Sequence, residues 1–417
     1  MKLNKLAMAT AIGLASIGGA NAACTTSTAT HIYITGSTAF RGAAVAAIEA
    51  SLNPGFSYTA YKESASFAPY ATARQTAGYA NYYGTLVSDG SCVVIKTAWS
   101  GSEAGYQDMV KCTSQKESFM DDAVGGFGGF GATSADSTST PATTDSHLVD
   151  ITMSDTSQPF AKVASRTPVI ANICRAGIIP FVWVKNAQTA ADIAAHPEYN
   201  DLKNVTHPQL RVAILNSGSK LSLFTGVASE NKYVYVAGRD NNSGTRANAL
   251  LDIGLPVTQA LVGQTIIGGA SGAPTLGALG NAGQSSGGTL GNTMLYTGSA
   301  VAADSINGGT GWYAIAYMGK PDAITREAQY YTQGPALIEL TLNGVAESDN
   351  AIEQGQYSYW GQEYCALANC DTLSSEAGVL WTTMCSKFPT SITAGLEIPM
   401  TAMQATKTPD SADPIHN

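Results

Sequence analysis

The segment 238–246, with the sequence GRDNNSGTR, contains residue types suited to binding an anion. It follows an alternating strand-like run over 233–236 and leads into a helix-like run over 246–255. The first backbone N–H groups of a helix have no partner within the helix, and the helix dipole makes that end electropositive. The segment offers four further aids to binding, namely the charge of Arg239, the hydroxyls of Ser243 and Thr245, and the close backbone approach that Gly244 allows. These features predict an oxyanion site where a strand turns into a helix.

Three earlier strand-like runs end in turns of small and hydroxyl-bearing residues. The run 31–34 leads into Thr-Gly-Ser-Thr-Ala-Phe, the run 92–98 into Trp-Ser-Gly-Ser, and the run 148–152 into Met-Ser-Asp. Ligands of open α/β folds bind beyond the carboxyl ends of the strands, so we expect these turns to face one ligand cleft. The candidate residues within them are Ser37, Thr38, Ala39, Phe40, Ser102 and Asp155.

The composition narrows the classes of function. Charged residues make up 13% of the 417 residues and the formal net charge is −9, which argues against nucleic acid or an anionic membrane surface as a partner. The five histidines are scattered and the seven cysteines form no Cys-x-x-Cys pair, so we expect no metal site. The matches to Gly-x-Gly-x-x-Gly at 126–131 and to Gly-x-Ser-x-Gly at 283–287 have no strand-like run before them. The sequence therefore predicts neither a cofactor nor an enzyme active site.

The N-terminus has the pattern of a cleavable secretory signal at residues 1–22. Two lysines precede an apolar run over 6–17, and Ala-Asn-Ala at 20–22 offers a small-residue cleavage site. We favour cleavage after Ala22, and the alternative is a lipoprotein signal that ends at Cys24. No later apolar run is long enough to span a bilayer, so we expect a periplasmic or secreted protein.

The seven cysteines of an exported chain favour disulfides. Cys92 starts a strand-like run and Cys112 ends the helix-like run that follows. A helix that returns antiparallel beside its strand brings these two ends together, so we predict a Cys92–Cys112 disulfide, with two separate buried thiols as the alternative. We expect a second disulfide of unknown pairing among Cys365, Cys370 and Cys385, and a buried free thiol at Cys174 because its segment is apolar.

The order of the elements predicts an α/β fold of two open α/β domains, joined by a hinge, with the ligand cleft between them. We place domain I at residues 23–168 plus 322–405 and domain II at 169–321, with a flexible tail at 406–417. The apolar run 167–184 is expected to cross between the domains as one or two buried strands.

Two Gly-rich stretches interrupt this pattern. The stretch 122–146 is expected to be an exposed loop, and the stretch 263–291 a hairpin pair or a flap. The sequence gives no role for either stretch.

Taken in order, the turns resemble those of the phosphate-specific periplasmic binding proteins of ABC transporters, the PstS-like branch of the type II periplasmic-binding fold. Gly36-Ser37-Thr38-Ala39-Phe40 looks like the first phosphate loop of this family, and Gly101-Ser102-Glu103-Ala104-Gly105 sits where the family has a Gly-Ser-Ser-Gly-Gly-type loop with a ligand-binding serine. Ser154-Asp155 resembles the family's Ser-Asp, and Arg239 with Ser243-Gly244-Thr245 matches its Arg-x-x-x-Ser-Gly-Thr. Asn241-Asn242 and the two Gly-rich stretches depart from the family pattern.

The resemblance implies a non-catalytic protein that closes two domains over phosphate for an ABC transporter permease in the inner membrane. In this family an aspartate at the position of Asp155 meets the ligand, and a carboxylate accepts a hydrogen bond from a protonated ligand oxygen. Phosphate carries such a proton near neutral pH and sulfate does not, so Asp155 would reject sulfate. Arg239 would hold Asp155 ionised while it also binds the ligand. The implied phosphate-binding residues are Ser37, Thr38, Ala39, Phe40, Ser102, Asp155, Arg239, Ser243, Gly244 and Thr245.

Each of these residues also has a plainer interpretation. Asp155 and Ser102 could cap the helices that follow them, and Arg239 could form only an ion pair between domains. A secreted or surface protein that scavenges phosphate or mediates adhesion is the main alternative function, and a hydrolase such as a phosphatase is a further one. The sequence does not separate phosphate from arsenate or another tetrahedral oxyanion.

Overall fold

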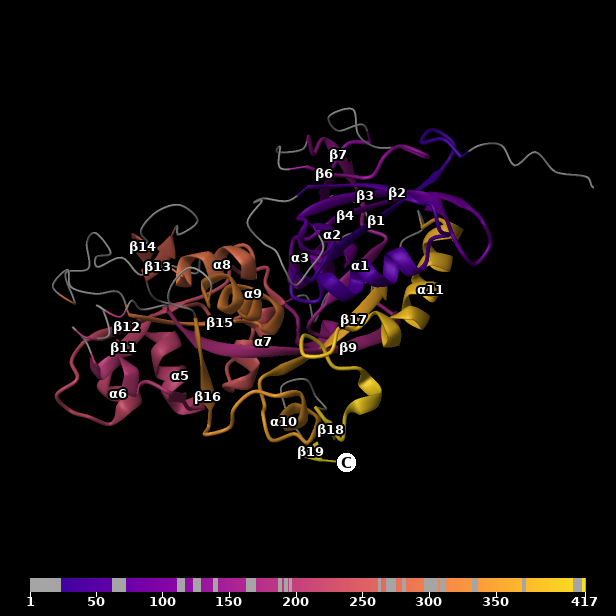
Figure 1. Cartoon of the computed structure of the whole chain (residues 1–417). Coiled ribbons are helices and arrows are strands. Elements are labelled where there is room, and N and C mark those ends of the chain that lie inside the picture. Colours follow the sequence, from indigo (N-terminus) through magenta and orange to yellow (C-terminus); the bar gives the residue numbers. More distant parts are fainter. Residues whose placement is uncertain are drawn as a thin grey trace, which may run out of the picture.

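The computed structural model describes most of the chain (Figure 1). The described residues are 24–61, 73–110, 117–122, 129–137, 142–162, 170–186, 190, 194, 197–261, 264–267, 275–279, 283–295, 307, 313–331, 337–369, 373–407 and 415–416. The predicted signal segment 1–22 lies outside them.

The first half of the molecule is built on one mixed sheet. Its central strands are β1 (Thr30–Gly36), β4 (Cys92–Ala98) and β8 (Ile151–Ser154), and β1 runs parallel to both of its neighbours. Beyond β4 the sheet continues with β3 (Tyr79–Thr85), β2 (Ser57–Tyr61) and β6 (Ala135–Ser137). On the other side, β17 (Trp360–Leu367) pairs antiparallel with β8.

Helices cover both faces of this sheet. Alternate residues of a strand point to opposite faces, and Ile32 and Ile34 of β1 share a buried cluster with α1 (Arg41–Ala50) and α11 (Ser375–Ser391). Tyr33 lies between them in sequence and belongs to a separate cluster with Tyr106 of α3 (Ser102–Val110). A short helix, α2 (Ala73–Thr76), lies beside α1.

The second half continues the same sheet with fewer strands. The strands β12 (Tyr233–Ala237) and β15 (Ala314–Gly319) are parallel, β11 (Gly218–Lys220) pairs with β12, and β16 (Ile338–Leu342) joins β10 (Asn204–Val205). The helices of this half are α5 (His207–Leu215), α6 (Ser222–Thr225), α7 (Gly244–Asp252), α8 (Gly287–Met294) and α9 (Lys320–Tyr331).

The long strand β9 (Asn172–Lys185) joins the two halves (Figure 1). Its residues 172–180 pair with β17 in the first half, while its residues 181–185 pair with β15 and β16 in the second. The expected buried crossing strand is therefore present, and the predicted α/β class is confirmed. The exact boundaries of two domains stay a proposal.

The remaining elements are short. They are β5 (Glu117–Phe119) with β7 (Asp145–His147), the antiparallel pair β13 (Gln264–Ile267) and β14 (Thr275–Leu279), α10 (Asp349–Glu353), β18 (Ala405–Thr406) with β19 (Ile415–His416), and 3-10 turns at Gln158–Phe160, Pro197–Asp201 and Met400–Ala402. The stretch 263–291 contains one antiparallel strand pair, β13 with β14, and its end belongs to helix α8, so the expected pair of hairpins is present only in part. Among the described residues, no helix combines the length and apolar composition needed to cross a bilayer.

The disulfide predictions are wrong in their pairing. Cys92 is bonded to Cys24 rather than to Cys112, which lies outside the described residues, and the two Cα atoms are 5.7 Å apart. Cys174 is not a free thiol, since it is bonded to Cys385 with a Cα–Cα distance of 6.1 Å.

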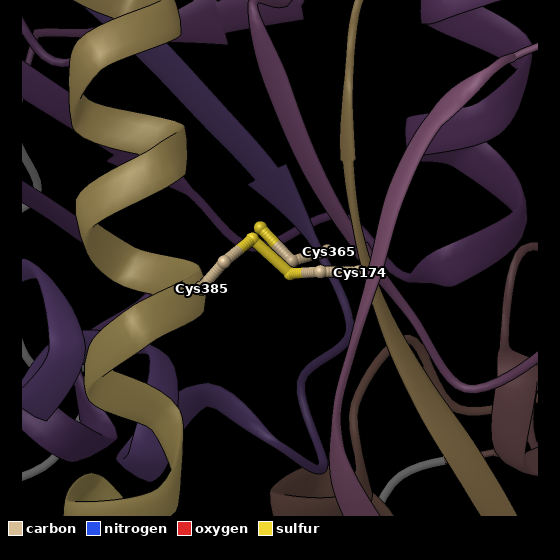
Figure 2. Close-up of side chains that lie close together, drawn as sticks. All are labelled: Cys174, Cys365 and Cys385. Atoms are coloured by element: carbon tan, nitrogen blue, oxygen red, sulfur yellow. A yellow bond between two sulfur atoms is a disulfide. The ribbon is translucent and has the colours of Figure 1, made fainter.

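Figure 2 shows Cys365 beside the Cys174–Cys385 disulfide. Cys365 is directly opposite Cys174 in the β17–β9 ladder, and the three sulfur atoms lie within 4.8 Å of one another. Cys365 is buried and is a free thiol. The disulfide expected among Cys365, Cys370 and Cys385 does not join Cys365 to Cys385, since Cys385 is bonded to Cys174, and Cys370 lies outside the described residues.

Candidate functional site

The first candidate loop turns sharply at the end of β1. Gly36 has φ +121°, and a Cβ atom there would lie 2.0 Å from the backbone oxygen of Met153 in the neighbouring strand. Only glycine fits this approach, which also lets the Ser37 N–H donate to the Met153 oxygen at 2.8 Å. The Ser37 hydroxyl donates to the carboxylate of Asp155. The loops after β1 and β8 are thus joined through a predicted pair of site residues.

The loop after β4 meets the same carboxylate from another side. Ser102 is the first residue of α3, and its hydroxyl oxygen accepts a hydrogen bond from the Asp155 N–H at 3.2 Å. Gly101, with φ +102°, donates its N–H to the Gly36 oxygen at 2.9 Å. Because β1 is parallel to both β4 and β8, their carboxyl ends lie at one edge of the sheet and these three loops meet there, as expected.

The Ser-Gly-Thr loop of the second half packs directly against them. A Cβ atom on Gly244 would lie 2.4 Å from the Ser102 hydroxyl oxygen and 2.7 Å from an Asp155 carboxylate oxygen. The Glu103 N–H donates to the Asn242 backbone oxygen at 3.1 Å. Ser243 caps α7, since its hydroxyl oxygen accepts from the Arg246 N–H at 3.2 Å. The two halves therefore touch at the predicted ligand loops.

Several backbone donors in these loops have no acceptor. Among the described residues, no hydrogen bond is made by the N–H groups of Thr38, Ala39, Gly244 and Thr245. The last two open α7, where the helix dipole favours negative charge. Buried backbone N–H groups are almost always paired, so this set is suited to an anion.

Arg239 is held in a fixed orientation beside these donors and is 2% exposed. Its Nε donates to the Gln284 backbone oxygen at 3.1 Å, and one terminal nitrogen, Nη2, donates to the Ser285 backbone oxygen at 3.0 Å and the Thr38 hydroxyl at 3.4 Å. The other terminal nitrogen, Nη1, is buried and has no partner in the described part of the chain. A charged donor left unpaired costs about 1–3 kcal/mol or more, so Nη1 is a strong candidate to bind a ligand.

The remaining predicted residues of the first loop play structural parts as well. The Phe40 ring packs against Phe388 with centroids 6.1 Å apart, and its N–H donates to the Ser37 hydroxyl oxygen at 3.3 Å. Ala39 is buried. Thr38 is the partly exposed member of the set and lines a cavity.

The contacts of Asp155, Ser102 and Arg239 bear on whether these residues only cap helices or form an ion pair. Asp155 uses its carboxylate to accept from Ser37, and Ser102 uses its hydroxyl to accept from Asp155 rather than from its own helix. In the described part of the chain no ion pair joins Arg239 to Asp155. Backbone oxygens of the second Gly-rich stretch hold the Arg239 side chain instead.

Glu363 is the residue that the sequence analysis missed. It lies in β17 opposite the end of β8, is 0% exposed, and sits against Asp155 and Ser37. The Ser37 hydroxyl hydrogen goes to Asp155, and within the described ranges neither carboxyl oxygen of Glu363 receives a hydrogen bond. Burial and then the neighbouring Asp155 carboxylate raise the pKa of Glu363 well above its usual range, so both factors favour its neutral form. A lone acid in the apolar run 360–367 was the available signal.

Other charged groups near the site are also buried. Burial raises the pKa of Glu103, whose carboxylate accepts from the Lys162 N–H at 2.8 Å. Burial likewise raises the pKa of Asp240 and lowers that of Arg246. The Arg246 guanidinium donates to the Arg239 backbone oxygen at 3.3 Å. Charged groups of both signs are thus close to the loops. The preference for an anion therefore rests on the N–H donors and Arg239 Nη1 and not on the net charge nearby.

Comparisons with known proteins give a likeness in architecture only. No family model matches the chain, and no curated protein matches its sequence. A solved structure from Clostridium perfringens, described as a phosphate ABC transporter substrate-binding protein with bound phosphate, has 11% identity and a TM-score of 0.43, over 89% of this chain and 100% of that one. An ABC-type phosphate transport receptor from Vibrio cholerae has 10% identity and a TM-score of 0.41, over 88% and 99%. Similarity this low leaves the assignment of function to the residues of the site.

Proposed function

We propose that this chain is an exported binding protein that captures phosphate, or a similar tetrahedral oxyanion, between its two halves without chemical conversion. The observation that carries the proposal is a set of donors without partners among the described residues, in adjoining loops of both halves. These donors are Arg239 Nη1 and the N–H groups of Thr38, Ala39, Gly244 and Thr245. They come from loops on both halves, so an anion could be enclosed from several directions.

Asp155 gives the site its preference for phosphate over sulfate. Its carboxylate already accepts from the Ser37 hydroxyl and has lone pairs left for a second donor. A ligand oxygen that carries a proton can supply that donor, whereas sulfate would place an unprotonated oxygen against a negative charge. The hydroxyls of Ser102, Ser243 and Thr245 complete the proposed set.

The cysteines support export. Two disulfides fit an oxidising compartment. Cys24 is bonded to Cys92, and a sulfur in a disulfide cannot carry a thioether-linked lipid, so cleavage after Ala22 accounts for this end of the chain better than a lipoprotein signal. We propose that the partner is an ABC transporter permease and that domains 23–168 plus 322–405 and 169–321 close over the ligand.

Isothermal titration of ligand-stripped protein with phosphate, and in parallel with sulfate, tests the proposal. We expect saturable phosphate binding and no heat from sulfate. Arg239→Met should weaken phosphate binding by about a hundredfold, because a charged hydrogen bond in a buried site is worth about 1.5–3 kcal/mol. Arg175→Met, which removes an exposed arginine from β9, serves as the control. Unchanged phosphate binding by Arg239→Met, in a variant with wild-type circular dichroism, would refute the assignment.

Asp155→Asn tests whether Asp155 makes the site prefer phosphate to sulfate. The amide can donate to an unprotonated oxygen, so this variant should gain sulfate binding relative to phosphate, while Asp89→Asn at an exposed position should not. Sulfate binding by the wild-type protein at phosphate-like affinity would contradict the role given to Asp155.

A further inference from the structure

A cavity of about 270 Å³ opens beside the proposed oxyanion site. One wall comes from the first half, through the loops after β1 and β4 and the start of β3, and the other from α8 and α9 of the second half. The volume is roughly nine times the ~30 Å³ that one water takes up in the liquid. A bound phosphate at Arg239 would leave this space for a further part of the ligand.

Two residues join the cavity to the oxyanion site. Thr38 lines the cavity and its hydroxyl accepts from Arg239 Nη2. Ser285 also lines the cavity, and its backbone oxygen accepts from the same nitrogen. The Arg239 guanidinium therefore lies at the boundary between the two spaces, and its Nη1 has no partner among the described residues.

The walls carry polar groups of both signs and aromatic surface. Hydroxyl side chains line it at Ser100, Ser286, Thr289 and Thr325, and aromatic rings at Tyr79 and Trp99. The Trp99 side chain is 9% exposed, and its indole N–H has no partner in the described part of the chain. Hydroxyls, an unpaired indole donor and ring faces are suited to a polyhydroxylated group, which has many donors and acceptors and C–H faces.

The cavity walls carry equal numbers of basic and acidic side chains, so they do not favour a second anion. Arg41 and Arg326 are accompanied by Asp322 and Glu117. The Arg326 guanidinium donates to the Asn292 side-chain oxygen at 3.2 Å and to the Gly288 backbone oxygen at 2.8 Å. The cavity thus suits an uncharged polar group.

We propose that the ligand is a phosphate monoester of a polyol, with its phosphoryl group at Arg239 and its hydroxylated substituent in this cavity. This inference rests on the proposed oxyanion site and names the class of ligand that would fill both spaces. The phosphoryl group of a monoester keeps a titratable oxygen, so the role proposed for Asp155 also holds for it.

Titration with glycerol 3-phosphate, glucose 6-phosphate and orthophosphate tests the inference. We expect at least one ester to bind more tightly than orthophosphate, by about tenfold or more. Binding of orthophosphate with exclusion of both esters would overturn this inference and leave the proposed function intact. No binding of any of the three would overturn both.

A cavity-filling variant locates the substituent. Thr325→Phe in α9 places a ring in the cavity and removes a hydroxyl that donates to the Pro321 backbone oxygen at 2.7 Å. Thr382→Phe is the matched control, because Thr382 is exposed on α11 and donates to the Gly378 backbone oxygen at 2.9 Å. We expect Thr325→Phe to weaken ester binding by about tenfold with orthophosphate binding within about twofold of wild type. Equal weakening of both ligands, or of neither, would refute the placement.

Discussion

Replacing Glu363 with glutamine should stabilise the ligand-free protein, and by more as the pH rises. Glu363 is 0% exposed and lies beside the Asp155 carboxylate, and no described residue donates to either of its carboxyl oxygens. Burial and Asp155 raise its pKa well above the usual value of 4.5. The folded protein therefore keeps a proton on Glu363 that the unfolded chain releases at ordinary acidic pH.

The sign and size follow from proton linkage. Between the unfolded and folded pKa values the folded state binds one more proton, so stability falls by about 1.4 kcal/mol for each pH unit. Glu363 thus lowers the free energy of unfolding progressively as the pH rises from its unfolded pKa towards its raised folded pKa. Glutamine does not titrate, and its amide can donate to Asp155 as the protonated acid does. The advantage of Glu363→Gln over wild type should grow by the same amount across this range.

Urea unfolding followed by tryptophan fluorescence, in phosphate-free buffer at three pH values, measures the difference. The pKa values of Glu397 and Glu327 are raised to about 7 and that of Asp150 to about 6, in each case chiefly by burial. These groups titrate in both proteins, so they cancel in the comparison to first order. Glu397 also contributes to the raised pKa of Glu363, and Glu397→Gln in both backgrounds corrects for it.

Glu376→Gln, the same chemical change at a partly exposed site, is the control. Stability curves of wild type and Glu363→Gln that stay parallel from pH about 5.5 to about 7.5 would refute the assignment of a buried neutral acid.

Three further predictions concern packing and the cysteines. Gly244→Ala would place a Cβ atom 2.4 Å from the Ser102 hydroxyl oxygen. The phosphate affinity of this variant, measured by calorimetry, should therefore fall about tenfold or more. The control Gly378→Ala should bind phosphate normally, because a Cβ atom there meets nothing within 4 Å. Replacing Cys174 and Cys385 together by serine removes a cross-link between residues 211 positions apart. The free energy of unfolding should fall by about 2–5 kcal/mol. A urea midpoint equal to that of wild type would contradict this prediction. The Cys365 thiol should resist iodoacetamide in the folded protein and react after unfolding, because burial raises its pKa, and mass spectrometry of its peptide reports either outcome.

The turns that form the candidate site could be predicted from the sequence because their geometry is local. The strand predicted at 92–98 matches β4 (Cys92–Ala98), and Gly36 and Gly101 mark turns with positive φ. Parallel pairing of β1 with β4 and β8 then brings the turns together. The pattern of a short strand followed by a Gly-Ser turn is therefore enough to predict where each turn lies.

The cysteine pairing could not be predicted, because it depends on contacts far apart in the sequence. Cys174 meets Cys385 only because α11 packs against β9. Glu363 was missed for a related reason. Whether an acid in a buried strand faces the site or the core depends on strand register, here Tyr364 opposite Ser154, and a one-residue shift reverses the face.

The second Gly-rich stretch, a departure from the family pattern, orients the side chain most important to the proposed site. A guanidinium has five N–H donors. Nε and Nη2 of Arg239 donate to the backbone oxygens of Gln284 and Ser285 and to the Thr38 hydroxyl. The two N–H groups of Nη1 have no partner in the part of the chain that the structure describes. This approach requires a small residue, since a Cβ atom on Gly283 would lie 2.4 Å from the Arg239 backbone oxygen. The stretch therefore fixes the arginine with its free edge available to the ligand, so changes there should alter phosphate affinity without touching phosphate.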